Sequence, residues 1–198
     1  MSVAEIWPLM RAALNQAGPV GQAFAQPLPD APAMQASPPV PQGLLRPVPS
    51  GLLALAQTAA ATTRDLAFAV ARLGGALGWR SSYTVDEAGA FAGGYAWAPL
   101  GGPDGPAICA AGLVSIMLVA PGLGYPPHHH APEEVYLVLC GQAEFRSDRQ
   151  PARLLGAGAL CHHAPHETHS LTTSDSAVLV LSVWRGAYQK SDFARRAA

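Results

Sequence analysis

The sequence predicts an α+β protein that is mainly β, in which an antiparallel β-barrel follows an N-terminal helical extension. After Trp79, short runs of β-prone residues alternate with Gly, Pro and Asp turns, without the strand-helix-strand alternation of a parallel sheet. Before that residue, apolar side chains recur at helical spacing. A chain of 198 residues is long enough for one domain of ordinary size with such an extension. We therefore expect residues 1–78 to form the extension, packed on the barrel, and residues 79–198 to form the barrel.

The extension is expected to contain two helical stretches. Apolar spacing predicts an amphipathic helix over residues 3–17 and a second helical stretch over residues 51–77, which Gly74-Gly75 interrupts. The nine prolines of residues 18–50 predict an irregular segment between them, because proline lacks a backbone donor and disfavours helix in the residue before it. We expect the helices to cap one mouth of the barrel.

The barrel is predicted from a series of short strands. Many short strands with frequent turns are typical of antiparallel sandwiches and barrels. Gly141 is expected to allow a hairpin turn between two of them. The predicted strands lie near residues 82–85, 93–98, 108–119, 134–140, 142–146, 160–163, 168–172 and 177–183.

Composition narrows the classes of partner. The net charge is −1 and the sequence contains no basic run, which argues against nucleic acid and anionic membrane and favours a small-molecule partner. Apolar stretches end well short of the roughly 20 residues that cross a bilayer, and the first residues lack the basic region of a secretory signal. Three cysteines without a Cys-x-x-Cys spacing indicate neither a disulfide framework nor a thiolate zinc site. We expect a soluble cytoplasmic protein.

The histidines give the strongest functional signal. All seven lie between His128 and His169, and they include a His-x-His-x3-Glu spacing formed by His128, His130 and Glu134. Because alternate residues of a strand face the same way, His128 and His130 are predicted to share one side, and Glu134 and Tyr136 to share a side of the next strand. A bend at residues 131–132 would bring them together, with His169 as the fourth ligand.

Imidazole and carboxylate ligands suit one divalent transition metal, and they leave Fe, Mn, Co, Ni and Zn all open. The alternation predicts that His129 faces away from the site. His162, His163 and His166 are expected to lie in or beside a turn, where hydration is easy, and not to bind the metal.

The chain resembles the cupin family, whose barrel is a jelly roll. Its first motif fits throughout as Gly122-x5-His128-x-His130-x3-Glu134-x6-Gly141. The second motif fits only in part: Gly158, Pro165 and His169 occur in order, but the inner glycine and the terminal asparagine are absent. Cupins often pair through their sheets, so the resemblance allows a homodimer.

A narrower resemblance, over residues 80–188, is to the cupin dimethylsulfoniopropionate lyases, which place a tyrosine two residues after the glutamate, here Tyr136. It implies cleavage of dimethylsulfoniopropionate to dimethyl sulfide and acrylate, with Tyr136 as the base. It also implies pocket aromatics at Tyr125 and Trp184. His128 is expected to bind the metal, or instead to orient a ligand or a bound water, and it is also counted among the substrate-binding residues. Tyr95 or Trp97 could add to an aromatic site for the sulfonium.

Two other functions stay open for the same ligand set. The first is an Fe(II) dioxygenase of the cupin type, which would need open metal positions more than a phenol base. The second is a cupin without catalytic activity that binds a metal or a small carboxylate. Tyr136 favours the lyase over the dioxygenase, and the lack of a DNA-binding segment or basic patch argues against a binding cupin that regulates transcription.

Overall fold

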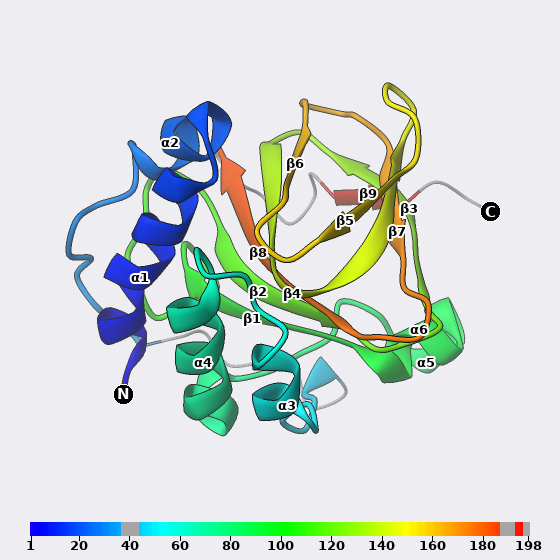
Figure 1. Ribbon diagram of the computed structural model, residues 1–198, viewed down its shortest axis with the longest axis horizontal. Helices are drawn as coiled ribbons and strands as arrows, with labels where there is room; N and C mark the ends of the chain where they lie inside the picture. Colours follow the sequence, from blue (N-terminus) through cyan, green and yellow to red (C-terminus); the bar gives the residue numbers. More distant parts are fainter. Residues whose placement is uncertain (37–43, 187–192, 196–198) are drawn as a thin grey trace.

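The computed structural model describes residues 1–36 and 44–186, and the backbone of residues 193–195. Within these ranges all the helices precede the strands, and the last of them, α6, leads directly into β1 (Figure 1). The helices are α1 (Val3–Gln16), α2 (Pro19–Ala25), α3 (Leu52–Ala56), α4 (Arg64–Leu73), the 3-10 helix η2 (Gly74–Leu77), α5 (Val85–Ala88) and α6 (Ala90–Gly94).

The strands form a bent antiparallel sheet that curls into a barrel. Along the main path the order is β1-β2-β8-β4-β7-β3-β9, with β5 and β6 also paired to β4. The strands are β1 (Tyr95–Gly101), β2 (Val114–Val119), β3 (Gly124–His130), β4 (Glu133–Ser147), β5 (Arg153–Gly156), β6 (Leu160–His163), β7 (His169–Thr172), β8 (Val178–Arg185) and β9 (Phe193–Arg195). The predicted α+β class with a jelly-roll type of barrel is confirmed.

Strand β4 is the central strand of the barrel, and the prediction of a hairpin turn at Gly141 is wrong. The strand passes through Gly141, pairing with β8 and β6 before it and with β5 and β7 after it. Gly141 has a φ of 73°, and a Cβ there would approach the Ala177 carbonyl oxygen to 1.9 Å. Only glycine tolerates both conditions. Gly141 therefore allows β4 to bend and to pass from one half of the barrel into the other.

Three other local predictions are corrected. Residues 82–85 form no strand, because Thr84 and Glu87 make a capping box that begins α5. The strand predicted over 108–119 begins only at Val114, since Gly112 lies against the Trp184 carbonyl oxygen with a φ of 147°. The segment expected to be irregular contains α2, whose first residue, Pro19, is in a position where the missing N–H costs nothing. Prolines 38, 39 and 41 lie outside the described residues.

Alternation along the strands separates two hydrophobic clusters. In β4, Val135, Leu137 and Leu139 pack with α1 and α4, whereas Tyr136 and Val138 point into the barrel. The helices of the extension therefore cover one face of the β1-β2-β8-β4 sheet and do not cap a mouth of the barrel, as Figure 1 shows. The interior cluster instead receives rings from the segment around α5 and α6.

The loop between α3 and α4 holds the bend of β4 through two threonines. The buried Thr63 hydroxyl donates to the Leu139 carbonyl oxygen at 2.7 Å, and the Gly141 N–H donates to Thr58 Oγ1 at 3.0 Å. The extension thus supplies hydrogen bonds where the ladder of β4 is irregular. Among the described residues, none of the helices has the length and apolar character needed to cross a membrane.

Candidate metal centre

Four residues of the predicted ligand set meet in the interior of the barrel. His128 and His130 lie on β3, Glu134 on β4, and His169 begins β7. The β3–β7 ladder places His128 directly opposite His169, and the bend at residues 131–132 turns β3 back into β4 as expected. All four side chains are at most 2% exposed. The structure therefore brings them together out of contact with bulk water.

Each of the three imidazoles is held in the same tautomer. The Nδ1 atoms of His128, His130 and His169 lie 2.8–2.9 Å from the backbone carbonyl oxygens of Pro126, Pro132 and Glu167 respectively. Because a carbonyl oxygen only accepts, Nδ1 carries the hydrogen, and the other nitrogen, Nε2, is left to face the site. Their ligand atoms all lie within 4.8 Å of one another. Three oriented imidazole nitrogens at this spacing fit a divalent transition metal.

Glu134 completes the cluster with an ionised carboxylate. Its Oε2 lies 2.9 Å from His130 Nε2 and 3.2 Å from His169 Nε2. Its Oε1 accepts hydrogen bonds from Ser182 Oγ at 2.5 Å and from Trp184 Nε1 at 2.6 Å. Burial raises the pKa of Glu134, but the hydrogen bonds and the histidines outweigh burial and hold the pKa well below 4.5. The carboxylate is therefore negatively charged at neutral pH.

The histidines differ in their charge. Burial lowers the pKa of His128 well below 6.5, so that imidazole is neutral at neutral pH. Burial also lowers the pKa of His130, but the hydrogen bond to Glu134 outweighs it and the net pKa is raised. The contact with Glu134 therefore favours a proton at the position where a cation would meet both groups.

Tyr136 lies beside this cluster on the same face of β4 as Glu134. Its ring centroid is 5.9 Å from that of His169 and 5.5 Å from that of His163. Burial, followed by the negative charge of Glu134, raises the pKa of Tyr136 well above 10. With protein groups alone the phenol is thus protonated, and it would ionise near neutral pH only beside added positive charge.

The predicted pocket aromatics both touch the cluster. Tyr125 stacks on His128 with ring centroids 4.3 Å apart, and Trp184 stacks on His130 at 4.0 Å. The Tyr125 hydroxyl lies 3.5 Å from that of Tyr95. Tyr125 also contacts the rings of Tyr83 and Phe91, two aromatic residues that were not predicted to lie near the site.

Trp97 is in a different environment from Tyr125 and Trp184. The Arg80 guanidinium lies 5.4 Å from the centroid of the Trp97 ring. A cation–π contact within the protein therefore already uses this ring.

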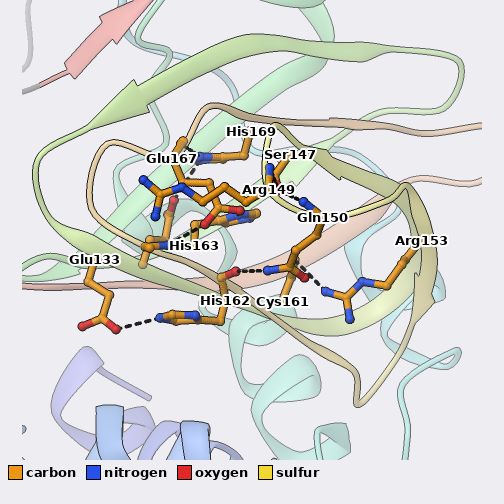
Figure 2. A network of polar contacts seen from close by, with 12 residues as sticks. Glu133, Ser147, Arg149, Gln150, Arg153, Cys161, His162, His163, Glu167 and His169 are labelled. Carbon is orange, nitrogen blue, oxygen red and sulfur yellow. Dashed lines mark hydrogen bonds and ion pairs between the residues drawn. The ribbon is translucent and has the colours of Figure 1, made fainter.

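The expectation for His163 is wrong. We expected it to be hydrated near a turn, but it is 1% exposed, lies in β6 opposite Glu134, and stacks on His169 (Figure 2). His162, its neighbour, faces the other way and contacts Glu133 at 2.7 Å. The burial of His163 could have been predicted from the strand over residues 160–163, because alternation places His163 on the same face as the interior Cys161.

His129 turns away from the site as predicted, with its ring 6.3 Å from that of His166. Ser182 was missed, because a serine inside an apolar strand carries no signal that it will meet a carboxylate from another strand.

A bent antiparallel barrel with a His-x-His-x3-Glu strand pair facing its interior defines a protein of the cupin class. Within that class, the chain belongs to the dimethylsulfoniopropionate lyase family, whose model matches residues 20–180.

Relatives and solved structures agree with this assignment. The chain is 36% identical over 133 residues to the dimethylsulfoniopropionate lyase DddQ of Ruegeria pomeroyi, covering 67% of this chain and 65% of that protein. It is 35% identical over 125 residues to the putative lyase DddL of Cereibacter sphaeroides, covering 62% of this chain and 51% of that protein. The chain thus matches less than two thirds of the length of either relative.

Two solved structures share the whole architecture. A chain from the crystal structures of the DMSP lyases RdDddP and RnDddQII superposes with a TM-score of 0.74 at 27% identity, over 99% of this chain and 100% of that one. The DddQ structure from Ruegeria pomeroyi gives a TM-score of 0.65 at 25% identity, over 90% and 93% of the two chains. Both comparisons extend over the helical region as well as the barrel.

Proposed function

We propose that the protein is a metal-dependent lyase that cleaves dimethylsulfoniopropionate to dimethyl sulfide and acrylate by β-elimination. The observation that carries the proposal is the convergence of three imidazoles, Glu134 and the Tyr136 phenol in one buried site. Membership of the family and the names of the relatives support the choice of substrate.

The proposed ligands are His128, His130, Glu134 and His169. Nitrogen and oxygen ligands without thiolate suit Fe, Mn, Co, Ni or Zn, and the chemistry below does not depend on which is bound. When bound, the cation would neutralise the substrate carboxylate and so lower the cost of negative charge on the carbon next to it.

Tyr136 is proposed as the base. Its oxygen takes a proton from the carbon next to the substrate carboxylate, and the electron pair of that C–H bond forms the C=C bond of acrylate. The C–S bond breaks with its electron pair passing to sulfur, which leaves as neutral dimethyl sulfide. Because the protein environment raises the pKa of Tyr136, the phenolate must be favoured by the positive charge held at the neighbouring ligands.

Tyr125 and Trp184 are proposed to line the substrate position, since they stack on His128 and His130 of the imidazole cluster. His128, itself a proposed ligand, is proposed to contact the substrate from within the cluster. The substrate carries a sulfonium cation, and aromatic faces attract such cations by about 0.5–2 kcal/mol. A related β-substituted propionate with a cationic leaving group would meet the same groups.

The test is headspace gas chromatography for dimethyl sulfide after purified, metal-loaded protein is mixed with dimethylsulfoniopropionate. We expect release that a chelator abolishes. Tyr136→Phe should keep the fold and the metal but lose about 10²–10⁴-fold in turnover, the usual contribution of a general base. Tyr83→Phe removes another buried phenol of the barrel interior and serves as the matched control.

Retained turnover in Tyr136→Phe would remove this residue from the mechanism. No dimethyl sulfide from protein that demonstrably contains metal would refute the lyase proposal and leave a cupin metal site with another substrate.

A further inference from the structure

The three imidazoles of the cluster share a second restraint besides the bond from Nδ1 to a carbonyl oxygen. Each has an aromatic ring stacked on its face, from the same strand for His128 and from another strand for His130 and His169. Tyr125 lies on His128 with an interplanar angle of 24°, and Trp184 lies on His130 with an angle of 30°. The carbonyl fixes which nitrogen faces the site, whereas the stacked ring restricts rotation of the imidazole about its bond to the chain.

For His169 the stacked ring is His163. The two ring centroids are 4.0 Å apart with an interplanar angle of 11°, the most nearly parallel of the three pairs. The rings of Tyr136 and His163 also make an edge-to-face contact, with centroids 5.5 Å apart and an interplanar angle of 74°. His163 therefore contacts both a proposed ligand and the proposed base.

The nitrogens of His163 make no hydrogen bond within the described part of the chain. Nδ1 lies 3.7 Å from Glu167 Oε1, beyond hydrogen-bond distance, although the side chain is 1% exposed. The same Glu167 accepts the Nδ1–H of His169 on its backbone carbonyl oxygen at 2.8 Å and the Ala164 N–H on its carboxylate at 2.8 Å. Figure 2 shows His163, Glu167 and His169 close to one another.

We propose that His163 is a positioning residue, whose ring sets the orientation of His169 by stacking on it and the orientation of Tyr136 by an edge-to-face contact. The contribution comes from the ring and not from its nitrogens, because a planar face is what the other two imidazoles receive from tyrosine and tryptophan. The part of the proposal that concerns Tyr136 rests on the proposed lyase function, whereas the part that concerns His169 requires only metal binding.

The experiment compares His163→Phe, which keeps a ring, with His163→Leu and His163→Asn, which do not. His162→Leu is the matched control, because it is the adjacent histidine of the same strand and faces away from the cluster. Protein stripped with a chelator is titrated with Co²⁺, and the visible absorption of the bound ion reports both affinity and ligand geometry. Circular dichroism verifies that each variant is folded.

We expect His163→Phe and His162→Leu to bind Co²⁺ within about twofold of the parent with the same spectrum. His163→Leu and His163→Asn should bind at least tenfold more weakly, with an altered absorption band. An equal loss of Co²⁺ affinity in His163→Phe and His163→Leu would overturn the proposal, because it would show that the nitrogens of His163 matter. Co²⁺ affinity near that of the parent in His163→Asn would overturn it for the same reason. Unchanged binding in His163→Leu would overturn it as well.

Turnover provides the second readout. With metal saturating, His163→Leu should lower kcat for dimethylsulfoniopropionate at least tenfold with little change in KM, and His163→Phe should restore kcat. Equal kcat in the two variants would overturn the role towards Tyr136. If the parent protein releases no dimethyl sulfide, the lyase function fails, while the Co²⁺ titration still decides the role towards His169.

Discussion

The substitution Ser182→Ala tests whether hydrogen bonding keeps the central carboxylate ionised. Ser182 Oγ donates to Glu134 Oε1 at 2.5 Å, and both side chains are at most 5% exposed. Removing a hydrogen bond to a buried charged group costs about 1.5–3 kcal/mol. Since one pKa unit corresponds to about 1.4 kcal/mol, the pKa of Glu134 in the folded protein should rise by roughly one to two units.

The same free energy predicts the thermal effect. For a chain of this size 1 kcal/mol shifts Tm by about 2–4 °C, so Ser182→Ala should lower Tm by roughly 3–12 °C at pH 7. The pKa of Glu134 is depressed in the folded state, so this stabilisation is full above the ordinary carboxyl pKa of 4.5. It is lost as the pH falls through the lowered pKa of the folded protein.

The assay is differential scanning calorimetry of chelator-treated protein between pH 3 and pH 8, which keeps metal binding out of the comparison. Ser115→Ala is the matched control. Ser115 is the register partner of Ser182 on β2, is equally buried at 5%, and lies one strand further from Glu134. Equal Tm values for the two variants at pH 7, or a difference that does not shrink below pH 4.5, would refute the reasoning.

Two further predictions concern the contacts around β4. Glu133→Gln weakens the contacts of that carboxylate with His162 and Arg185, which outweigh burial and lower the pKa of Glu133. The Tm difference from the parent should therefore be present at pH 7 and narrow as the pH falls below 4.5, and a difference independent of pH in the same calorimetric series would contradict this. Thr63→Val removes the donor to the Leu139 carbonyl oxygen at nearly constant volume and should cost about 1–3 kcal/mol, or roughly 2–12 °C in Tm. Metal content per folded molecule should not change in Thr63→Val, and a Tm equal to that of the parent would show that this hydrogen bond does not stabilise the bend.

The local part of the site follows from strand alternation in the sequence, whereas its long-range contacts depend on strand pairing. His169 was predicted as the fourth ligand, but Ser182 was not predicted. Alternation in a strand places His128 beside His130, and Glu134 beside Tyr136, without any knowledge of the fold. His169 comes opposite His128 only because β7 pairs with β3, and Ser182 reaches Glu134 only because β8 pairs with β4.

Prediction failed at elements where a backbone contact decides the conformation. Gly141 has the residue type of a hairpin turn, and yet it continues β4, because the carbonyl oxygen of Ala177 on the neighbouring segment lies where a side chain would be. The capping box at Thr84, by contrast, was visible in the sequence as Thr-x-x-Glu and outweighed the β propensity of residues 82–85.

The arrangement of hydrogen-bond acceptors gives a physical reason for a cation at this site. Glu134 is ionised and buried, and Nε2 of His130 and of His169 both face its Oε2. A proton on His130, which the contact with Glu134 favours, would offset one negative charge, but Nε2 of His169 has no hydrogen-bond partner among the described residues. Buried acceptors that converge in this way are stabilised by positive charge placed between them.

The same positive charge bears on the reactivity of Tyr136. The Glu134 carboxylate raises the pKa of the phenol, so the group that would hold the cation is also the group that keeps the proposed base protonated when no cation is present. Loading the site reverses the sign of the local charge, which favours both the phenolate and a carboxylate substrate. Metal binding is therefore expected to activate the base through this change in local charge. The pH at which Tyr136 loses its proton should fall as metal occupancy rises.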